Sequence, residues 1–240
     1  MIKLSKRLEA ICRLLEKTGT LADIGCDHGY ISVYAVQSGR ADRCIAMDLR
    51  QGPLERADEN IKKYSLEDKI ETRLSDGADA LVPGEADSVV IAGMGGMLME
   101  EILARGHEVF SAMEQLVLQP QSDMEHFRSF LAQTGYEVEA EDIVVEEGKF
   151  YPMMRARFTG KSYIPDSQQL SYGYMLPKTG GEVMRLYLEN ERQKLETALG
   201  RLENDGRGER AALRIKELKD RIRLNGVVYD AMLGSNGQSL

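Results

Sequence analysis

Acidic residues and glycines recur in the first 100 residues, each time beside a short apolar run. The first group lies in residues 21–30, where Gly25 and Gly29 bracket a tight turn between an apolar run and a helical pattern. Amide groups at such a helix start present unpaired donors and a partial positive charge. A strand, glycine turn and helix in this order are typical of a site for the polar part of a nucleotide-like cofactor.

Two further acids follow at the distances that such a site needs. Asp48 closes the apolar run 44–47, about 20 residues after the turn, where a carboxylate can accept hydrogen bonds from ribose hydroxyls. Asp76 follows the run 70–75 and precedes Gly77. Because the carboxyl ends of parallel strands meet at one edge of a sheet, we expect these corners to form one site.

A second glycine cluster, Gly93, Gly95 and Gly96, follows the apolar run 88–92. Three glycines in four residues weaken a strand or a helix, so something must approach the backbone closely there. Close packing of a helix on the sheet is one explanation. A floor for a bound ligand is the other, and the place of the cluster at the same predicted sheet edge favours it.

The hydrophobic pattern predicts an α/β fold with seven strands. Five apolar runs alternate with helical patterns, as in a parallel sheet, at 21–24, 44–47, 70–74, 88–92 and 115–119. Two β-rich runs, 136–145 and 150–158, are joined by a turn-forming segment and predict a final antiparallel hairpin. A nicotinamide-binding domain normally keeps its strands parallel, so this hairpin disfavours a hydride-transfer enzyme.

The composition changes near residue 160. Prolines and glycines after Tyr163 indicate a linker, and two apolar stripes at helical spacing then flank a turn at 204–208. We expect a ligand-binding domain over residues 1–160, then a linker and a helical coiled-coil hairpin over residues 161–240. The hairpin could pack on the main domain, dimerise or lie along an RNA, and the sequence leaves these alternatives and the oligomeric state open.

Charge is unevenly distributed along the chain. The formal net charge of −8 divides into 16 basic against 28 acidic residues over 1–150, which gives −12, and 15 against 11 over 151–240, which gives +4. A basic C-terminal part could contact phosphates, although solvated helix faces explain it equally well.

Cysteine usage and apolar content indicate the compartment. The three cysteines are odd in number and lack metal-ligand spacing, so we expect reduced thiols in a cytoplasmic protein and no metal site. Apolar runs long enough to span a bilayer are missing from the sequence, which predicts no membrane partner.

Several segments of the chain resemble the bacterial tRNA adenine-22 N1-methyltransferase family, most strongly up to about residue 158. The matching segments are Leu4-Ser5-Lys6-Arg7-Leu8, Ala22-Asp23-Ile24-Gly25 followed by Asp27-His28, Gly52-Pro53, Asp76-Gly77, Ile91-Ala92-Gly93-Met94-Gly95-Gly96, Leu118-Gln119-Pro120 and Glu146-Glu147-Gly148-Lys149-Phe150-Tyr151. The chain departs from the family at Cys26, Gly29, Met47-Asp48 and Gln121.

The resemblance implies a class I, Rossmann-like methyltransferase with a C-terminal coiled coil, the cofactor S-adenosyl-L-methionine, and methylation of N1 of the adenine at tRNA position 22. On this basis we expect the cofactor to be held by Asp23, Gly25, Cys26, His28, Gly29, Asp48, Leu49, Asp76, Gly77, Ala92, Gly93 and Met94. We expect substrate contacts from Arg7, Tyr30, Gly95, Gln119 and Pro120. A basic rim around the site is expected from Lys3, Lys6, Arg7, Arg155, Arg157 and Lys161, together with the Arg and Lys residues of the C-terminal tail.

Asp27 is the candidate for catalysis. Adenine N1 has its own lone pair and becomes cationic on methylation, so a nearby carboxylate could stabilise the developing charge or accept a proton from N6. The alternative is that Asp27 only caps the following helix.

Two other classes of function remain possible at this point. One is a noncatalytic RNA-binding or scaffold protein on a methyltransferase fold. The other is a nicotinamide-dependent oxidoreductase, which the missing Gly-x-Gly-x-x-Gly spacing disfavours.

Overall fold

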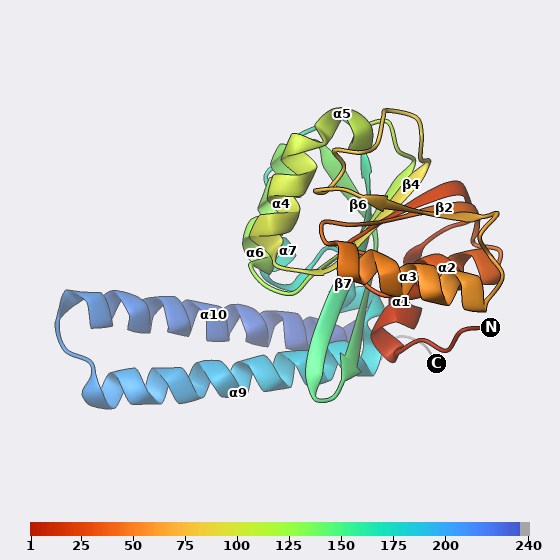
Figure 1. Cartoon of the computed structure of the whole chain (residues 1–240). Helices are drawn as coiled ribbons and strands as arrows, with labels where there is room; N and C mark the ends of the chain where they lie inside the picture. Colours follow the sequence, from red (N-terminus) through yellow and green to blue (C-terminus); the bar gives the residue numbers. More distant parts are fainter. Residues whose placement is uncertain (236–240) are drawn as a thin grey trace. The chain divides into compact units, whose positions relative to one another are not determined.

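The computed structural model describes residues 1–235 and separates into two compact units (Figure 1). The N-terminal unit is Met1–Pro165, and the C-terminal unit begins at Asp166. The sequence places the boundary five residues earlier, after residue 160.

A seven-stranded sheet forms the centre of the N-terminal unit, in the order β3-β2-β1-β4-β5-β7-β6. Parallel pairing joins the first five strands along the chain, which are β1 (Thr18–Ile24), β2 (Ala41–Asp48), β3 (Ile70–Leu74), β4 (Ser88–Met94) and β5 (Gln115–Pro120). The last two strands, β6 (Tyr136–Glu146) and β7 (Lys149–Phe158), pair antiparallel, and β7 is also antiparallel to β5. The predicted Rossmann-like methyltransferase sheet with a terminal antiparallel hairpin is therefore confirmed.

The strand register brings the predicted corners to one edge of the sheet. Ile24 pairs with Met47 of β2 and with Ile91 of β4, and Asp48 pairs with Leu74 of β3. Since these strands are parallel, the loops after β1, β2, β3 and β4 all leave from the same side.

Helices cover both faces of this sheet (Figure 1). On one side lie α1 (Lys6–Leu14), α2 (Tyr30–Gln37) and α3 (Gln51–Lys63); on the other lie α4 (Gly96–Arg105), α5 (His107–Phe110) and α6 (Met124–Gln133). The central strand β4 is accordingly apolar on both faces, with Val89, Val90 and Ile91 fully buried.

The turn between β6 and β7 has two central residues in the left-handed region of backbone conformation. Glu147 has φ of 49° and Gly148 has φ of 74°. Positive φ at both central residues is the geometry of a two-residue turn that matches the twist of antiparallel strands. Pro120 is the last residue of β5, so this strand ends one residue beyond the predicted run 115–119.

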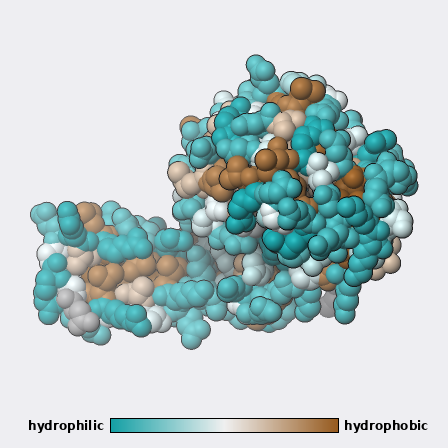
Figure 2. All heavy atoms as spheres, viewed as in Figure 1, coloured by the Kyte–Doolittle hydropathy of each residue, from teal (hydrophilic) through white to brown (hydrophobic). Residues whose placement is uncertain are grey.

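The C-terminal unit is helical. Its long helices α9 (Gly181–Asp205) and α10 (Gly208–Ser235) lie side by side and antiparallel (Figure 1), and Leu188, Leu195 and Leu218 are buried. Two short helices, α7 (Ser167–Tyr172) and α8 (Leu176–Thr179), occupy the segment expected to be an irregular linker. Figure 2 shows apolar side chains gathered along the helical pair between hydrophilic margins. Within the described residues, neither unit contains a helix long and apolar enough to cross a bilayer.

Candidate cofactor and active site

The turn after β1 is bonded to the end of β2. The amides of Gly25 and Cys26 both donate to the carbonyl of Met47, at 2.8 and 2.9 Å. Gly25 has φ of +75°, a backbone conformation that favours glycine, and a Cβ there would displace the flexible tip of the Met94 side chain. The turn thus links the corners of three neighbouring strands.

Asp23 lies under this turn and is 3% exposed. Its Oδ2 accepts hydrogen bonds from the amide and the hydroxyl of Ser32, at 3.2 and 2.6 Å, which fixes the first turn of α2. Burial raises the pKa of Asp23 to about 6, against the lowering effect of the Ser32 hydrogen bonds.

Asp48 and Asp76 occupy the next two corners. Oδ1 of Asp48 accepts from the amide of Arg50 at 3.0 Å, and the carbonyl of Asp48 accepts from the amide of Ser75, also at 3.0 Å. Asp76 pairs with Arg105 at 2.9 Å, and this hydrogen-bonded cation lowers the pKa of Asp76. The side chain of Leu49 beside them is 64% exposed, so an apolar surface adjoins the two carboxylates.

Asp27 departs from the geometry of a helix cap. The N-cap of α2 is Gly29, which has no side chain to cap the helix, and the carboxylate bonded to the first turn of α2 is that of Asp23. Instead, Oδ1 of Asp27 accepts from Nη2 of Arg56 at 3.0 Å, and Oδ2 lies 3.7 Å from Nε2 of His28. The carboxylate is therefore held beside the turn rather than folded onto α2.

A pocket of about 90 Å³ opens beside the glycine turn and gathers many of the expected site residues. Its lining comprises Arg7, Leu8, Asp23, Gly25, Cys26, Asp27, Tyr30, Ile31 and Ala92. The pocket therefore joins residues expected to hold the cofactor with Asp27 and with two residues expected to contact the substrate.

Arg7 connects this pocket to the corners after β4 and β5. Its Nη1 donates to Oε1 of Gln119 at 2.8 Å, and its guanidinium lies over the Tyr151 ring at 5.6 Å. A Cβ on Gly93, which has φ of +81°, would approach Nη1 of Arg7 to 3.3 Å. Arg7 is thus placed by three elements and is not an ordinary surface ion pair.

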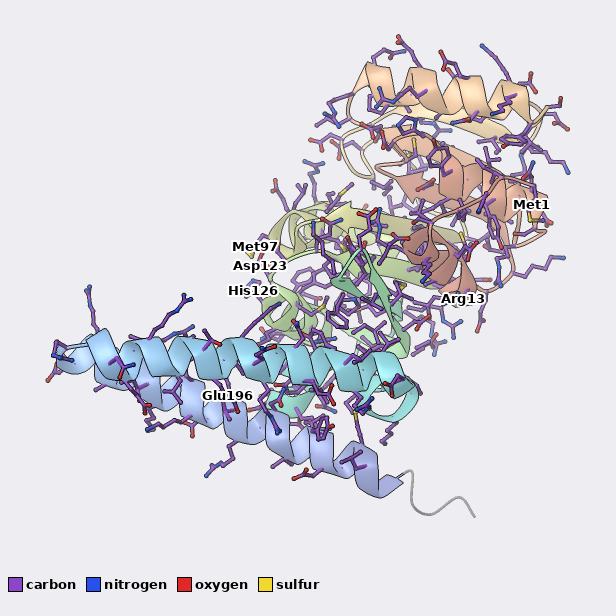
Figure 3. All side chains as sticks on the ribbon, turned by 90° about the horizontal axis from the view of Figure 1, so that it is seen from below. Met1, Arg13, Met97, Asp123, His126 and Glu196 are labelled. Atoms are coloured by element: carbon purple, nitrogen blue, oxygen red, sulfur yellow. The ribbon has the colours of Figure 1, made fainter. Side chains whose placement is uncertain are left out.

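The second glycine cluster has a packing role and a role at the site edge. A Cβ on Gly96 would lie 2.6 Å from the carbonyl oxygen of Ser122, so the loop after β5 presses on the start of α4. Figure 3 shows Met97, Asp123 and His126 close together where α4 and α6 begin. Gly95 and Gly96 therefore admit this loop, whereas Gly93 faces Arg7.

The remaining expected residues are outside the pocket lining. His28 stacks on Tyr30, which lines the pocket, with their ring centroids 5.2 Å apart, and Tyr30 is 38% exposed. Pro120 pairs with Met94 in the sheet, and the amide of Gln121 donates to the carbonyl of Met94 at 2.8 Å. Gly29 and Gly77 both have positive φ, as expected for turn residues at these corners.

Two arginines expected on the basic rim serve the fold instead. Arg155 is 16% exposed in its side chain, and it contacts the carbonyl of Leu14 and the carboxylates of Glu16 and Glu139. Arg157 pairs with Glu139 at 3.0 Å. Their charges are already matched by neighbouring acids, which weakens them as phosphate contacts.

The cysteines are buried and unpaired. Burial raises the pKa of Cys12 to about 12 and raises those of Cys26 and Cys44 as well. Cys26 is therefore a neutral turn residue rather than a nucleophile. Within residues 1–235, no group of His, Cys, Asp and Glu side chains is arranged to hold a metal ion.

The site fits a charged nucleoside cofactor. Gly25 lines the pocket without a side chain, so its backbone can meet a ligand, and buried Asp23 supplies a carboxylate suited to an ammonium group. Asp48, 10% exposed in its side chain, supplies a carboxylate suited to ribose hydroxyls. These residues match the amino acid and nucleoside parts of S-adenosyl-L-methionine.

The sheet order, the terminal antiparallel hairpin and the glycine turn flanked by these acids define a class I methyltransferase that uses S-adenosyl-L-methionine. A methyltransferase domain family matches residues 4–154. The Bacillus subtilis tRNA (adenine(22)-N(1))-methyltransferase is 33% identical over 233 residues, which cover 95% of this chain and 98% of that protein. The chain belongs to the tRNA (adenine(22)-N(1))-methyltransferase family.

Solved structures agree with this assignment over nearly the whole chain. The Bacillus subtilis m1A22 tRNA methyltransferase TrmK aligns with a TM-score of 0.85 and 31% identity, covering 95% of this chain and all of that one. Streptococcus pneumoniae Sp1610, solved in complex with S-adenosyl-L-methionine, aligns with a TM-score of 0.83 and 29% identity, covering 95% and 100%.

Proposed function

We propose that this protein transfers the methyl group of S-adenosyl-L-methionine to N1 of the adenine at position 22 of tRNA. The observation that carries the proposal is the pocket beside the cofactor turn, where Arg7, Asp27 and Tyr30 meet. The similarity to the Bacillus subtilis tRNA (adenine(22)-N(1))-methyltransferase supports the substrate.

The residues that would hold the cofactor are those of the β1, β2 and β3 corners. Asp23 is suited to its amino group, Asp48 to its ribose and Asp76 with Leu49 to its base. When bound, the cofactor supplies an electrophilic methyl group on a sulfonium. The protein must then align a nucleophile with that group, at near-attack distance.

The residues on the substrate side suit an extruded adenine. A base in folded tRNA has to leave its stack to reach the pocket, and the stacked rings of His28 and Tyr30 offer it a flat surface. Adenine N1 needs no base to activate it, but the product is a cation. The carboxylate of Asp27 stabilises that charge as it develops.

Arg7 positions the substrate side of the pocket. Its guanidinium is fixed by Gln119 and by the Tyr151 ring, so it presents its remaining donors in one orientation. Gly95 and Pro120 border the same corner. We propose tRNA as the partner and the cytoplasm as the compartment, which agrees with three unpaired thiols.

The two competing classes of function can be separated by two assays on the whole protein. Calorimetry with S-adenosylhomocysteine and with NAD should give binding of the former alone, and binding of NAD alone would indicate an oxidoreductase. Incorporation of tritiated methyl from S-adenosyl-L-methionine into tRNA should then proceed to completion. A protein that binds tRNA and S-adenosylhomocysteine without incorporating methyl would be a noncatalytic RNA-binding protein.

A further inference from the structure

Side chains on one face of α3 contact the turn that carries Asp27. Nη2 of Arg56 donates to Oδ1 of Asp27 at 3.0 Å, and Nδ2 of Asn60 donates to the carbonyl of His28, also at 3.0 Å. Between them, Ala57 packs so closely on Gly29 that a Cβ there would lie 3.1 Å from its methyl group. Helical geometry places positions 56, 57 and 60 on one side, so three successive turn residues meet three side chains of one helix.

The turn needs such support because its backbone is unusual. Asp27 has φ of 48°, in the left-handed region, and its side chain is 61% exposed. A left-handed aspartate is tolerated but costs roughly 1 kcal/mol, and an exposed side chain is free to adopt several rotamers. Without an external partner, the carboxylate would not keep one orientation toward the pocket.

The Arg56 side chain is 43% exposed, and only part of its guanidinium is buried. Its Nε is buried and finds no hydrogen-bond partner among residues 1–235. Nη1 lies in van der Waals range of the position that a Cβ on Gly52 would take, at 3.6 Å. Nη2 faces Asp27, so the guanidinium bonds Oδ1 of the carboxylate while Oδ2 lies 3.7 Å from Nε2 of His28.

We propose that Arg56 is a positioning residue for methyl transfer, which acts by fixing the carboxylate of Asp27 beside the pocket. The inference rests on the proposed role of Asp27 at the adenine. It assigns to α3 a function beyond covering the sheet, because this helix carries the partner of the group that meets the substrate.

The experiment compares steady-state methylation of tRNA by Arg56→Gln, Arg56→Lys and the wild-type protein. Both charges of the pair are partly exposed, so the loss is modest: kcat should fall about threefold to tenfold in Arg56→Gln. The KM for S-adenosyl-L-methionine should stay within about twofold, since α3 does not contribute its cofactor carboxylates. Arg56→Lys retains the charge without the planar fork and should recover part of the loss.

Lys62→Gln is the matched control. Lys62 is an exposed cation on α3, so its loss changes the helix charge by the same amount without touching the turn. We expect wild-type kcat from this variant. An equal fall in Lys62→Gln and Arg56→Gln would mean that Arg56 acts through general attraction of tRNA, and it would overturn the proposal.

A double-mutant cycle distinguishes this proposal from the role of Asp27 itself. Asp27→Asn tests that role, and Arg56→Gln made in the Asp27→Asn background should produce no further fall in kcat. The same fall in both backgrounds would overturn the positioning role while leaving the role of Asp27 intact. Normal kcat in Asp27→Asn would overturn both, and methylation of tRNA by the wild type would still support the overall function.

Binding of S-adenosylhomocysteine verifies that each variant is folded. If Arg56→Gln does not fold, Arg56→Lys replaces it in the comparison with the wild type.

Discussion

Asp23 combines a structural role with a proposed role in holding the cofactor. Its two hydrogen bonds to Ser32 order the start of α2, yet burial raises its pKa to about 6. A buried carboxylate that gains a nearby cation becomes easier to ionise. Binding of the ammonium group of the cofactor at this residue should therefore release a proton near pH 6.

Asp23→Asn should flatten the dependence of stability on pH. The pKa of Asp23 rises from 3.8 to about 6 on folding, so between these values the folded protein binds more protons than the unfolded chain. The resulting stabilisation is complete below about pH 3.8 and is lost as the pH rises through about 6. We would measure the free energy of unfolding in urea at pH 4 and at pH 7. The value at pH 4 minus the value at pH 7 should be lower in the variant than in the wild type by about 2 to 3 kcal/mol.

Asp42→Asn serves as the control for this measurement, because Asp42 is an exposed aspartate on β2. Its pH dependence should match that of the wild type. A wild-type dependence in Asp23→Asn as well would show that Asp23 is ionised throughout this range in the folded protein.

Arg7→Ala should impair methylation, whereas Arg13→Ala on the same helix should not. Arg7 donates to Gln119 at 2.8 Å inside the site, while Arg13 is 56% exposed and pairs with Asp142. Hydrogen bonds to charged groups contribute about 1.5 to 3 kcal/mol, so kcat/KM for tRNA should fall at least tenfold in Arg7→Ala. Equal activity of the two variants would show that Arg7 has no role in methylation.

Among the elements, the strands were predictable and the short helices were not. The apolar runs of β1, β2 and β4 are buried on both faces, so their residue types alone mark them as strands of a parallel sheet. The short helices α5, α7 and α8 have four to six residues, too few for an apolar stripe to repeat.

The same difference applies to the candidate site. The acids and glycines at the strand ends could be predicted, because a doubly wound topology fixes where strand ends lie. Arg56 and Asn60 could not be predicted, because their contacts arise from the close packing of Ala57 on Gly29. Only the spacing of residues 56 and 60, one helical turn apart, hints that they share a face.

The contact between the starts of α4 and α6 can be tested with a single methyl group. A Cβ at Gly96 would lie 2.6 Å from the carbonyl oxygen of Ser122, so Gly96→Ala must displace backbone. We expect its free energy of unfolding to fall by about 1 to 3 kcal/mol. Gly52→Ala in α3 meets only the tip of Arg56, at 3.6 Å, and should leave thermal stability equal or slightly higher.

The long helices of the C-terminal unit are pinned by a buried polar residue. Asn225 is fully buried, donates to the carbonyl of Leu188 at 3.1 Å and accepts from Nε of Arg192 at 3.0 Å. Such a residue fixes the register of two packed helices. Asn225→Ala should destabilise the unit by about 1 to 3 kcal/mol, measured by chemical denaturation followed by circular dichroism.

Asn190→Ala, at a half-buried position of α9, provides the comparison for Asn225→Ala. It should change the midpoint of denaturation little. If Asn225→Ala also left the midpoint unchanged, the buried amide would not be what holds α9 and α10 in register.

For the molecule as a whole, the sequence motifs indicate a tRNA substrate, whereas the acidic net charge alone would argue against one. The N-terminal 150 residues carry a net charge of −12, and several of their arginines are already paired with acids. A polyanionic tRNA must therefore be bound by a limited set of unmatched cations. Its affinity should be strongly dependent on salt concentration.

The central claim is that this protein methylates one adenine of tRNA at N1, and mapping the modified nucleotide tests it most directly. Bulk tRNA would be treated with the protein and S-adenosyl-L-methionine, then digested and sequenced by mass spectrometry. We expect a single added methyl group, on N1 of adenine 22, and none on tRNA in which that adenine is replaced by guanine. Methyl groups at another position, or equal incorporation into the replaced tRNA, would contradict the proposed substrate.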